Sequence, residues 1–137
     1  MTEIKQKLLT EERALYRSSG FCVKDVIFDE GESPLKHSSN IELDHAIFRG
    51  KYPVWYSSDI DMHDSTVFET GRAGFWYTDR LSVRDSIIAA PKCIRRCRRV
   101  SLENVSLPMA AETIWECRDV KLKNVTANGD YLCMNCH

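Results

Sequence analysis

The chain repeats one pattern of apolar and small residues about every 20 residues along its length of 137. In each repeat two large apolar residues stand six positions apart, and we call them the first and the second anchor. The anchor pairs are Leu15/Phe21, Leu35/Ile41, Val54/Ile60, Phe75/Leu81, Ile94/Val100 and Ile114/Val120. Successive second anchors lie 20, 19, 21, 19 and 20 residues apart. A period this short and regular is typical of a solenoid, in which each repeat packs on its neighbours.

Other positions also keep their residue type from one repeat to the next. Two positions after the second anchor the residues are apolar: Val23, Leu43, Met62, Val83, Leu102 and Leu122. Three positions after the first anchor they are mostly small: Ser18, Ser38, Ser57, Thr78, Cys97, Cys117 and Asn135. Four positions after the second anchor they are Asp25, His45, Asp64, Asp85, Asn104 and Asn124. Asp and Asn tolerate left-handed backbone, so this last column predicts a corner in every coil.

The apolar residues alternate with period two in short runs, and the repeats lack the i, i+3, i+4, i+7 spacing of a helix. This pattern predicts an all-β protein, a single-stranded right-handed parallel β-helix of about six to seven coils. A leucine-rich repeat is the alternative, because Ile114, Cys117 and Val120 also fit its spacing. The return segments favour the β-helix, since they carry a strand-like apolar pair such as Val105 with Leu107.

The repeats continue without a linker, and we predict one β-helix domain over residues 13–137. A seventh repeat opens at Leu132 and ends at His137, so its coil is incomplete. Residues 1–12 are expected to form a partial coil that caps the other end, since an uncovered coil exposes apolar side chains and unpaired backbone groups. The incomplete last coil predicts a homodimer through that end, or a chain that is a fragment of a longer protein.

Several segments also carry a resemblance to a known family: GESPLKHSSNIEL, KYPVWYSSDI, RAGFWYTDRLSVRDS, IAAPKCIRRCRRVSLENV and AAETIWECRDVKLKNVTANGDY. They resemble a family of uncharacterised bacterial proteins with a domain of unknown function, placed with the pectin-lyase-like right-handed β-helices. The resemblance covers essentially the whole chain. It implies the β-helix fold and a superfamily in which many members bind or cleave polysaccharides. It implies no established activity and brings no assigned catalytic residues.

The charge of the chain limits its partners. Nineteen basic residues against twenty acidic ones give a net charge of −1. A nucleic-acid or anionic-membrane partner requires a basic surplus, so neither is expected. No apolar run reaches the 18 residues of a membrane helix, and residues 1–10 lack the apolar core of a secretory signal. The protein is therefore expected to be cytoplasmic, with reduced cysteines.

The two residues that follow each first anchor form columns that include all three tryptophans of the chain. The candidate ligand-binding residues are Trp55, Tyr56, Trp76, Tyr77, Arg95, Arg96 and Trp115. Strict alternation would bury charged residues such as Arg96 and Glu116, so both columns are expected to face out. Sugars pack on aromatic rings, and arginine pairs with uronate carboxylates. Alternatively, the rings stabilise the sheet by stacking, or a partner subunit covers them.

Candidate catalytic residues lie in the turns before the first anchors. Glu112 and Asp130 each stand two positions before a first anchor, which predicts carboxyl groups one coil, about 5 Å, apart. Retaining glycosidases show this separation, but so do any two stacked acidic residues. Lys92 and Arg72 are the alternative candidates, as the base and the charge neutraliser of a β-elimination. The competing interpretation is a set of solvated turn charges that compensate one another.

The six cysteines predict neither a metal site nor a cofactor. The segment CMNCH at 133–137 matches the C-x-x-C-H haem-attachment string, but that chemistry belongs to exported proteins. A zinc site built on Cys133, Cys136 and His137 lacks a fourth ligand. Cys97 and Cys117 share the small column, so we expect buried thiols one coil apart.

Two functions are compatible with these patterns. The first is a β-helix that binds carbohydrate through its aromatic and arginine columns, and acts on it as a lyase or hydrolase if it is an enzyme. The second is a non-enzymatic scaffold whose aromatic face or open end is a protein interface. A grooved, solvent-filled aromatic face favours the first function, and a flat face covered by another chain favours the second.

Overall fold

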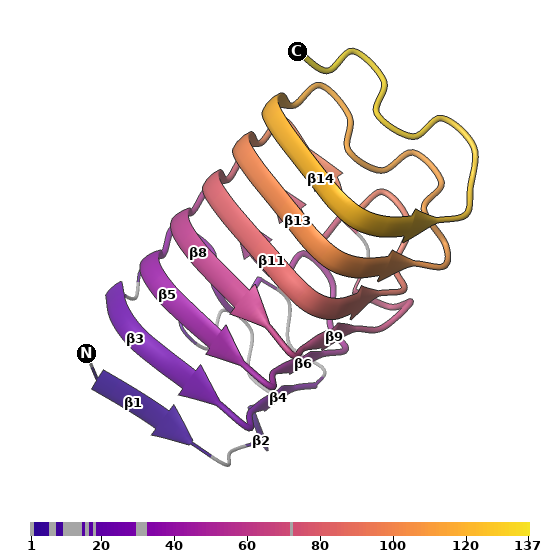
Figure 1. The fold of residues 1–137 in the computed structure, drawn as a ribbon. Coiled ribbons are helices and arrows are strands. Elements are labelled where there is room, and N and C mark those ends of the chain that lie inside the picture. The colour runs from indigo at the N-terminus through magenta and orange to yellow at the C-terminus, as the bar shows by residue number, and fades with distance from the viewer. Residues whose placement is uncertain are drawn as a thin grey trace.

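A computed structural model describes residues 2–5, 8–9, 15, 17, 19–29, 33–71 and 73–137 of the protein. The regular elements among these residues are all β-strands, so the described chain contains no helix able to cross a membrane. The strands run parallel and stack into a β-solenoid of about six turns, with the two termini at opposite ends (Figure 1). The predicted all-β parallel solenoid with coils of about 20 residues is confirmed.

The strands fall into three kinds of segment. The first segments form a three-stranded sheet of β7 (Val54–Trp55), β10 (Phe75–Trp76) and β12 (Ile94–Arg95). The second segments begin with β1 (Thr2–Lys5), β3 (Ser19–Lys24), β5 (Ser39–Asp44) and β8 (Ser58–His63). The third segments are β2 (Leu8–Leu9), β4 (Ile27–Phe28), β6 (Ile47–Phe48) and β9 (Thr66–Val67). Second and third segments are continuous in β11 (Asp79–Ile88), β13 (Arg98–Leu107) and β14 (Arg118–Ala127).

Neighbouring coils pair in the register that the anchor columns predict. Phe75 lies opposite Val54 on one side and Ile94 on the other. Leu81 lies opposite Val100 in the larger sheet. Because the coils are in register, side chains of one column are spaced by about 4.8 Å, the distance between neighbouring strands. The surface chemistry of the protein is therefore arranged in rows that run along the solenoid axis.

Left-handed backbone turns the chain at the corners of each coil. The Asp, His and Asn column that was predicted as a corner has φ between 50° and 54°. Further corners carry residues with no preference for this backbone, such as Tyr77, Arg80, Lys92, Arg96 and Arg99. Left-handed backbone costs a non-glycine residue roughly 1–2 kcal/mol. Hydrogen bonds between coils offset this cost: Tyr77 N donates to Arg95 O (3.0 Å), and Arg96 N donates to Trp115 O (2.9 Å).

The inward columns form one continuous apolar core, in which Val83 and Leu102 are each 1% exposed. The small column closes this core beside the first anchors, and most of its described side chains are hydrogen-bonded to the preceding coil. Ser57 Oγ donates to Leu35 O (2.7 Å), and Cys97 Sγ donates to Phe75 O (2.7 Å). Buried polar groups need such partners. The requirement explains why this column holds Ser, Thr or Cys; Ser18, its first predicted member, lies outside the described residues.

The prediction that the seventh coil opens at Leu132 is wrong by one residue. Cys133 N donates to Thr113 O (3.1 Å), and Glu116 N donates to Met134 O (2.8 Å). This register makes Cys133 the equivalent of the first anchor Ile114, and Cys136, not Asn135, the next member of the small column. In the other coils the first anchor follows the preceding second anchor by 13 to 15 residues. Leu132 would shorten this interval to 12 residues, whereas Cys133 keeps it at 13.

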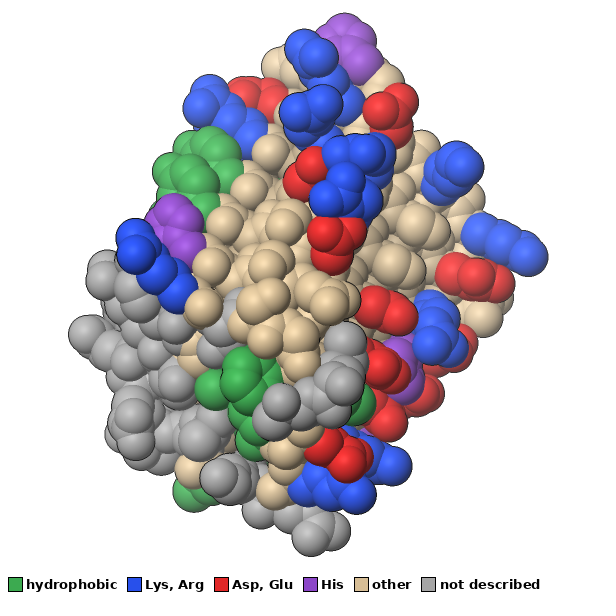
Figure 2. Space-filling model, turned by 90° about the vertical axis from the view of Figure 1, so that its left-hand side faces the viewer, with side chains coloured by type: hydrophobic (Ala, Val, Ile, Leu, Met, Phe, Trp, Pro, Cys, Tyr) green, Lys and Arg blue, Asp and Glu red, His purple; other side chains and the backbone are tan. Residues whose placement is uncertain are grey.

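Charged residues form a row along the outer surface of the larger sheet. Asp59 accepts a hydrogen bond from Arg80 Nη2 (2.9 Å), and Asp79 accepts one from Arg99 Nε (2.9 Å). These bonds lower the pKa of both carboxyl groups below the usual aspartate range. Figure 2 shows the resulting line of acidic and basic side chains along this face. Opposite charges on neighbouring strands stabilise the in-register pairing.

Leu102→Asp should unfold the protein cooperatively, because it places an unpaired carboxylate in the buried column between Val83 and Leu122. We expect a loss of about 4 kcal/mol or more in the free energy of unfolding. Leu122→Asp is the matched control, since Leu122 occupies the same column but is 43% exposed. Thermal melting followed by circular dichroism checks both variants. Equal melting temperatures for the two variants would contradict the assigned register.

Candidate functional site

Both predicted ligand-binding columns face outward, beside the small three-stranded sheet. Trp55 and Trp76 end their strands and are half-buried, and Tyr56, the next residue, is 46% exposed. The second column lies at a left-handed corner, with φ of 52° at Tyr56 and 56° at Tyr77. This backbone ends the strand alternation, so two consecutive side chains can point away from the core. The expectation that both columns face outward is confirmed.

The aromatic rings of these columns stack on one another along the solenoid axis. The Trp55 and Trp76 rings lie 5.1 Å apart at an interplanar angle of 3°, and the Tyr56 and Tyr77 rings lie 4.6 Å apart at 2°. The His37 ring stacks on Tyr56 at 5.2 Å. Each ring therefore covers a face of its neighbour and turns an edge to solvent. The ring faces inside these stacked pairs are therefore closed to a sugar that needs an open ring face.

Arginines continue both stacks in the next coil. The Arg95 guanidinium lies 5.1 Å from the centre of the Trp76 ring, and the Arg96 guanidinium lies 5.9 Å from that of Tyr77. Arg96 Nε donates to Glu116 Oε2 (2.6 Å). This hydrogen bond lowers the pKa of Glu116 and raises the pKa of Arg96. Cation–π contact and ion pairing thus hold both guanidinium groups in place.

The tryptophan column also fastens the turns that hold the catalytic candidates. Trp76 Nε1 donates to Lys92 O (2.7 Å), and Trp115 Nε1 donates to Tyr131 O. Each indole thereby bonds to the turn of the next coil. The aromatic column and the turns before the first anchors form one connected surface.

A notch of about 220 Å³ opens where Arg95 takes the place of a tryptophan. Its lining residues are Trp76, Lys92, Arg95, Glu112 and Trp115. Lys92 Nζ and Glu112 Oε2 form an ion pair of 3.2 Å at its rim. Arg95 Nε is buried and has no hydrogen-bond acceptor among the described residues. The notch brings together three predicted ligand-binding residues and two predicted catalytic ones.

The predicted stacking of Asp130 on Glu112 is wrong. Glu112 N donates to Asp130 O (3.0 Å), and in this hydrogen-bond pattern the residue after the acceptor is the true neighbour. Tyr131 therefore occupies the column of Glu112, with φ of 64° at the corner. The error follows from the one-residue shift of the last coil, and it removes the register argument for a carboxylate pair. Arg72, the remaining catalytic candidate, lies outside the described residues.

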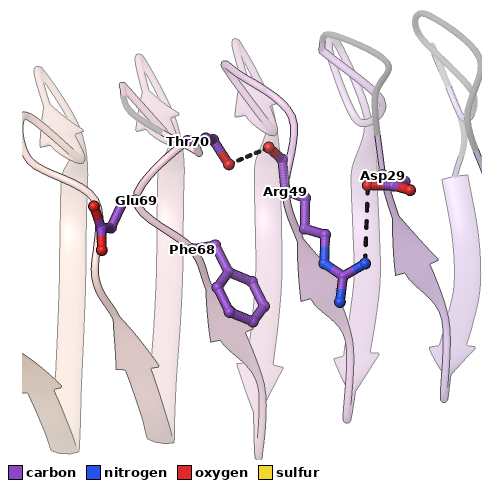
Figure 3. A pocket seen from close by; sticks show the side chains of 5 residues that line it. All are labelled: Asp29, Arg49, Phe68, Glu69 and Thr70. Carbon is purple, nitrogen blue, oxygen red and sulfur yellow. Dashed lines mark hydrogen bonds and ion pairs between the residues drawn. The ribbon is translucent and has the colours of Figure 1, made fainter.

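A second hollow, of about 450 Å³, lies where the third strand segments end, and sequence reasoning missed it. Its lining residues are Asp29, Arg49, Phe68, Glu69 and Thr70, and Figure 3 shows their side chains around the opening. Arg49 pairs with Asp29 (3.9 Å) and lies 5.4 Å from the Phe68 ring centre. Asp29, Arg49 and Phe68 share one position of the repeat, and this shared position could have indicated from the sequence that they lie side by side. We favour the notch as the candidate site, because it brings together five residues predicted from the sequence and this hollow contains none of them.

A histidine cluster on the larger sheet was also missed. His63 is buried beside Glu42, Asp44 and Asp64, and Figure 2 shows acidic side chains gathered around histidine on this face. Burial lowers the pKa of His63, but hydrogen bonds to Asp64 and Glu42 and the charge of Asp44 outweigh it, so the pKa lies above its usual value. The signal in the sequence was the repeat position that holds Asp44 and then His63.

These features define a class of protein: a parallel β-solenoid with an exposed aromatic and arginine face. The chain belongs to the family described as "Protein of unknown function (DUF3737)", whose family model matches residues 2–137. The predicted membership in a family of unknown function is thus confirmed. Comparison with curated proteins and with solved structures found no match.

The cysteines continue the small column into the last coil. Cys97 and Cys117 are buried, as predicted, and Cys136 Sγ donates to Ile114 O (3.0 Å) in the same way. Cys133 lies in the first-anchor column, so the two cysteines of CMNCH occupy different columns. Burial raises the pKa of Cys93 to about 12 and also raises the pKa of Cys97.

Iodoacetamide at about pH 8 should label Cys22 well before Cys93 and Cys97, because only the thiolate reacts and burial suppresses it. Peptide mapping by mass spectrometry measures the rate at each site in the native protein. The denatured protein is the control, in which all six cysteines should react at similar rates. Labelling of native Cys93 as fast as Cys22 would show that the core around it is not closed.

Proposed function

We propose that the protein is a binding module that takes a carboxylated ligand, such as a uronate unit of an acidic saccharide, in the notch between Trp76 and Trp115. The observation that carries this proposal is Arg95, a cation whose Nε lacks an acceptor where the tryptophan column is interrupted. Guanidinium groups bind carboxylates through two parallel hydrogen bonds. Glu116 already pairs with Nη2 of Arg95 (3.7 Å), and a carboxylated ligand would offer an acceptor for the unbonded Nε.

The notch also supplies the other contacts that such a ligand needs. Lys92 lies at the rim with its side chain 58% exposed, and its ammonium group adds a second positive charge. Trp115 has only the Arg95 side chain, rather than a second ring, between itself and Trp76. A volume of about 220 Å³ is below the roughly 300–1,000 Å³ of most small-molecule sites. We therefore propose that one sugar unit enters the notch while the rest of the chain lies outside it.

The geometry supports binding better than catalysis. A lysine that acts as a base is usually desolvated in an apolar pocket. Lys92 is instead exposed and paired with Glu112. The stacked carboxylate pair of a retaining glycosidase is not formed, because Tyr131, and not Asp130, occupies the position of Glu112 in the next coil. The lining residues are suited to hold an anionic ligand.

A relation to the pectin-lyase-like right-handed β-helices is part of the proposal. Parallel coils of about 20 residues with a stacked apolar core support it. Many members of that superfamily bind polysaccharides, and this favours a saccharide over other carboxylated ligands. A cytoplasmic location, proposed from the sequence alone, would make the ligand an intracellular acidic sugar or oligosaccharide.

The alternative is a scaffold whose aromatic face is a protein interface, and the stacking favours it. The rings of Trp55, Trp76, Tyr56 and Tyr77 are engaged with one another, so most of this face stabilises the solenoid rather than offering open ring surface. Under this alternative, Trp76→Ala should lower the mass measured by light scattering, and no saccharide should change the tryptophan fluorescence. An unchanged mass together with a saccharide response would exclude the interface.

Arg95→Trp tests the proposed notch directly. The variant completes the tryptophan column and fills the notch, so the fold should be retained while the carboxylate-binding cation is lost. We expect trigalacturonate to change the tryptophan fluorescence of the unmodified protein, with at least about tenfold weaker binding in Arg95→Trp. Arg96→Gln is the matched control, because Arg96 does not line the notch.

Two outcomes would contradict the carboxylate proposal. The first is equal trigalacturonate binding by the unmodified protein and Arg95→Trp. The second is equal binding of trigalacturonate and an uncharged trisaccharide, because the proposal assigns recognition to the Arg95 cation.

A further inference from the structure

A histidine surrounded by carboxylates lies on the larger sheet, and none of these residues lines the notch. Glu42 and Asp44 are on β5, and Asp61 and His63 are on β8, all on the outer side of the sheet. Asp64 follows at the corner. His63 is only 9% exposed, so the surrounding side chains cover most of the imidazole.

Both ring nitrogens of His63 face carboxylate oxygens. Nε2 lies 3.1 Å from Glu42 Oε1. Nδ1 lies 3.0 Å from Asp64 Oδ2 and 3.5 Å from Asp44 Oδ1. The ligand atoms of Asp44, His63 and Asp64 all lie within 4.8 Å of one another. Three potential metal ligands thus lie close together, and a third carboxylate, that of Glu42, lies on the far side of the ring.

The backbone fixes this arrangement. Asp44 and His63 are direct partners in the register between β5 and β8, so their side chains stand side by side. Asp64 is the left-handed corner residue, with φ of 50°. This corner is what allows its carboxylate to turn back onto the ring of the preceding residue. The two strands and the corner preorganise the cluster without a flexible loop.

Asp61, two residues before His63 on β8, adds a half-buried carboxylate to the same side of the sheet, outside the group of three ligands. Asp61 Oδ1 is buried without a hydrogen-bond partner among the described residues. Asp61 is also the direct partner of Glu42, and like charges opposite one another destabilise a sheet. The charged residues at these paired positions and the corner are four carboxylates, Glu42, Asp44, Asp61 and Asp64, and two cations, Lys24 and Arg84. Carboxylates therefore outnumber cations at the positions around His63.

We propose that Nδ1 of His63 and the carboxylates of Asp44 and Asp64 bind a divalent transition-metal ion of the zinc type. Two ligand atoms at about 2.1 Å from a tetrahedral zinc ion are about 3.4 Å apart. The 3.5 Å between Nδ1 and Asp44 Oδ1 fits this value, and the 3.0 Å between Nδ1 and Asp64 Oδ2, a hydrogen-bond distance, is shorter. Imidazole with carboxylates favours zinc and its neighbours over calcium and magnesium, which prefer oxygen ligands alone.

Glu42 acts as a positioning residue for this site. Ligand histidines usually donate the N–H of their other nitrogen to a carboxylate, which fixes the tautomer and orients the ring. Glu42 Oε1 is placed to accept that bond from Nε2. Three protein ligands leave a fourth tetrahedral position to water or to an exogenous ligand.

Titration of the full chain with Co²⁺ as the probe tests the site. Binding should give one equivalent of visible d–d absorption without the thiolate charge-transfer band that cysteine ligands produce. Asp64→Asn should weaken binding at least about tenfold, and Glu42→Gln by about 10–100-fold. Asn suits the corner backbone, since Asn104 and Asn124 occupy the same column. Asp85→Asn, in that column one coil further, is the control that keeps full affinity.

Three results would overturn the proposal. Binding that is equal in Asp64→Asn and Asp85→Asn would show that Asp64 is no ligand. A thiolate charge-transfer band that persists in Asp64→Asn would place the ion on the cysteines. Absence of Co²⁺ and Zn²⁺ binding by the folded protein, measured by equilibrium dialysis, would show that the cluster is not a metal site. Circular dichroism confirms that each variant is folded.

Discussion

Each coil of this protein turns through residues with left-handed backbone, and most of these residues are not glycine. A single left-handed residue is unfavourable, so the coil geometry depends on backbone hydrogen bonds to the coils on either side. Tyr77 and Arg96 illustrate this, because each donates its corner N–H to the next coil. The same bonds keep the coils in register, and the register stacks the inward columns into a core.

The register also determines what the surface can do. Similar rings stack on each other, as Trp55 and Trp76 do, and opposite charges pair, as Asp59 and Arg80 do. In such rows the ring faces and the charges are already in contact with one another, so few of them are open to a ligand. Each of the two proposed sites lies where the residue type changes along a row. Arg95 interrupts the tryptophan column, and His63 follows Asp44 in a column of otherwise charged residues.

Much of the fold was predictable because the stacked coils require the same type of residue at the same position of every repeat. Anchors such as Leu81 and Val100, and the corner at Asp85, are visible as columns in the sequence. The last coil was misplaced by one residue, because turns of different length precede the first anchors. The outward direction of Tyr56 was predicted from charge, and the mutual stacking of the rings agrees with the alternative that the rings stabilise the sheet. The His63 cluster depends on a corner residue that folds back on its neighbour, and no column shows such a contact.

Directed cross-linking tests the in-register stacking most directly. Ser82 on β11 and Ser101 on β13 are direct partners on the outer side of the sheet. Cysteines at these positions should form a disulfide under mild oxidation, because neighbouring strands place their Cα atoms within the range that a disulfide spans. Ser82→Cys with Glu103→Cys, two residues out of register, should not. Peptide mapping that finds the second cross-link in preference to the first would contradict the account.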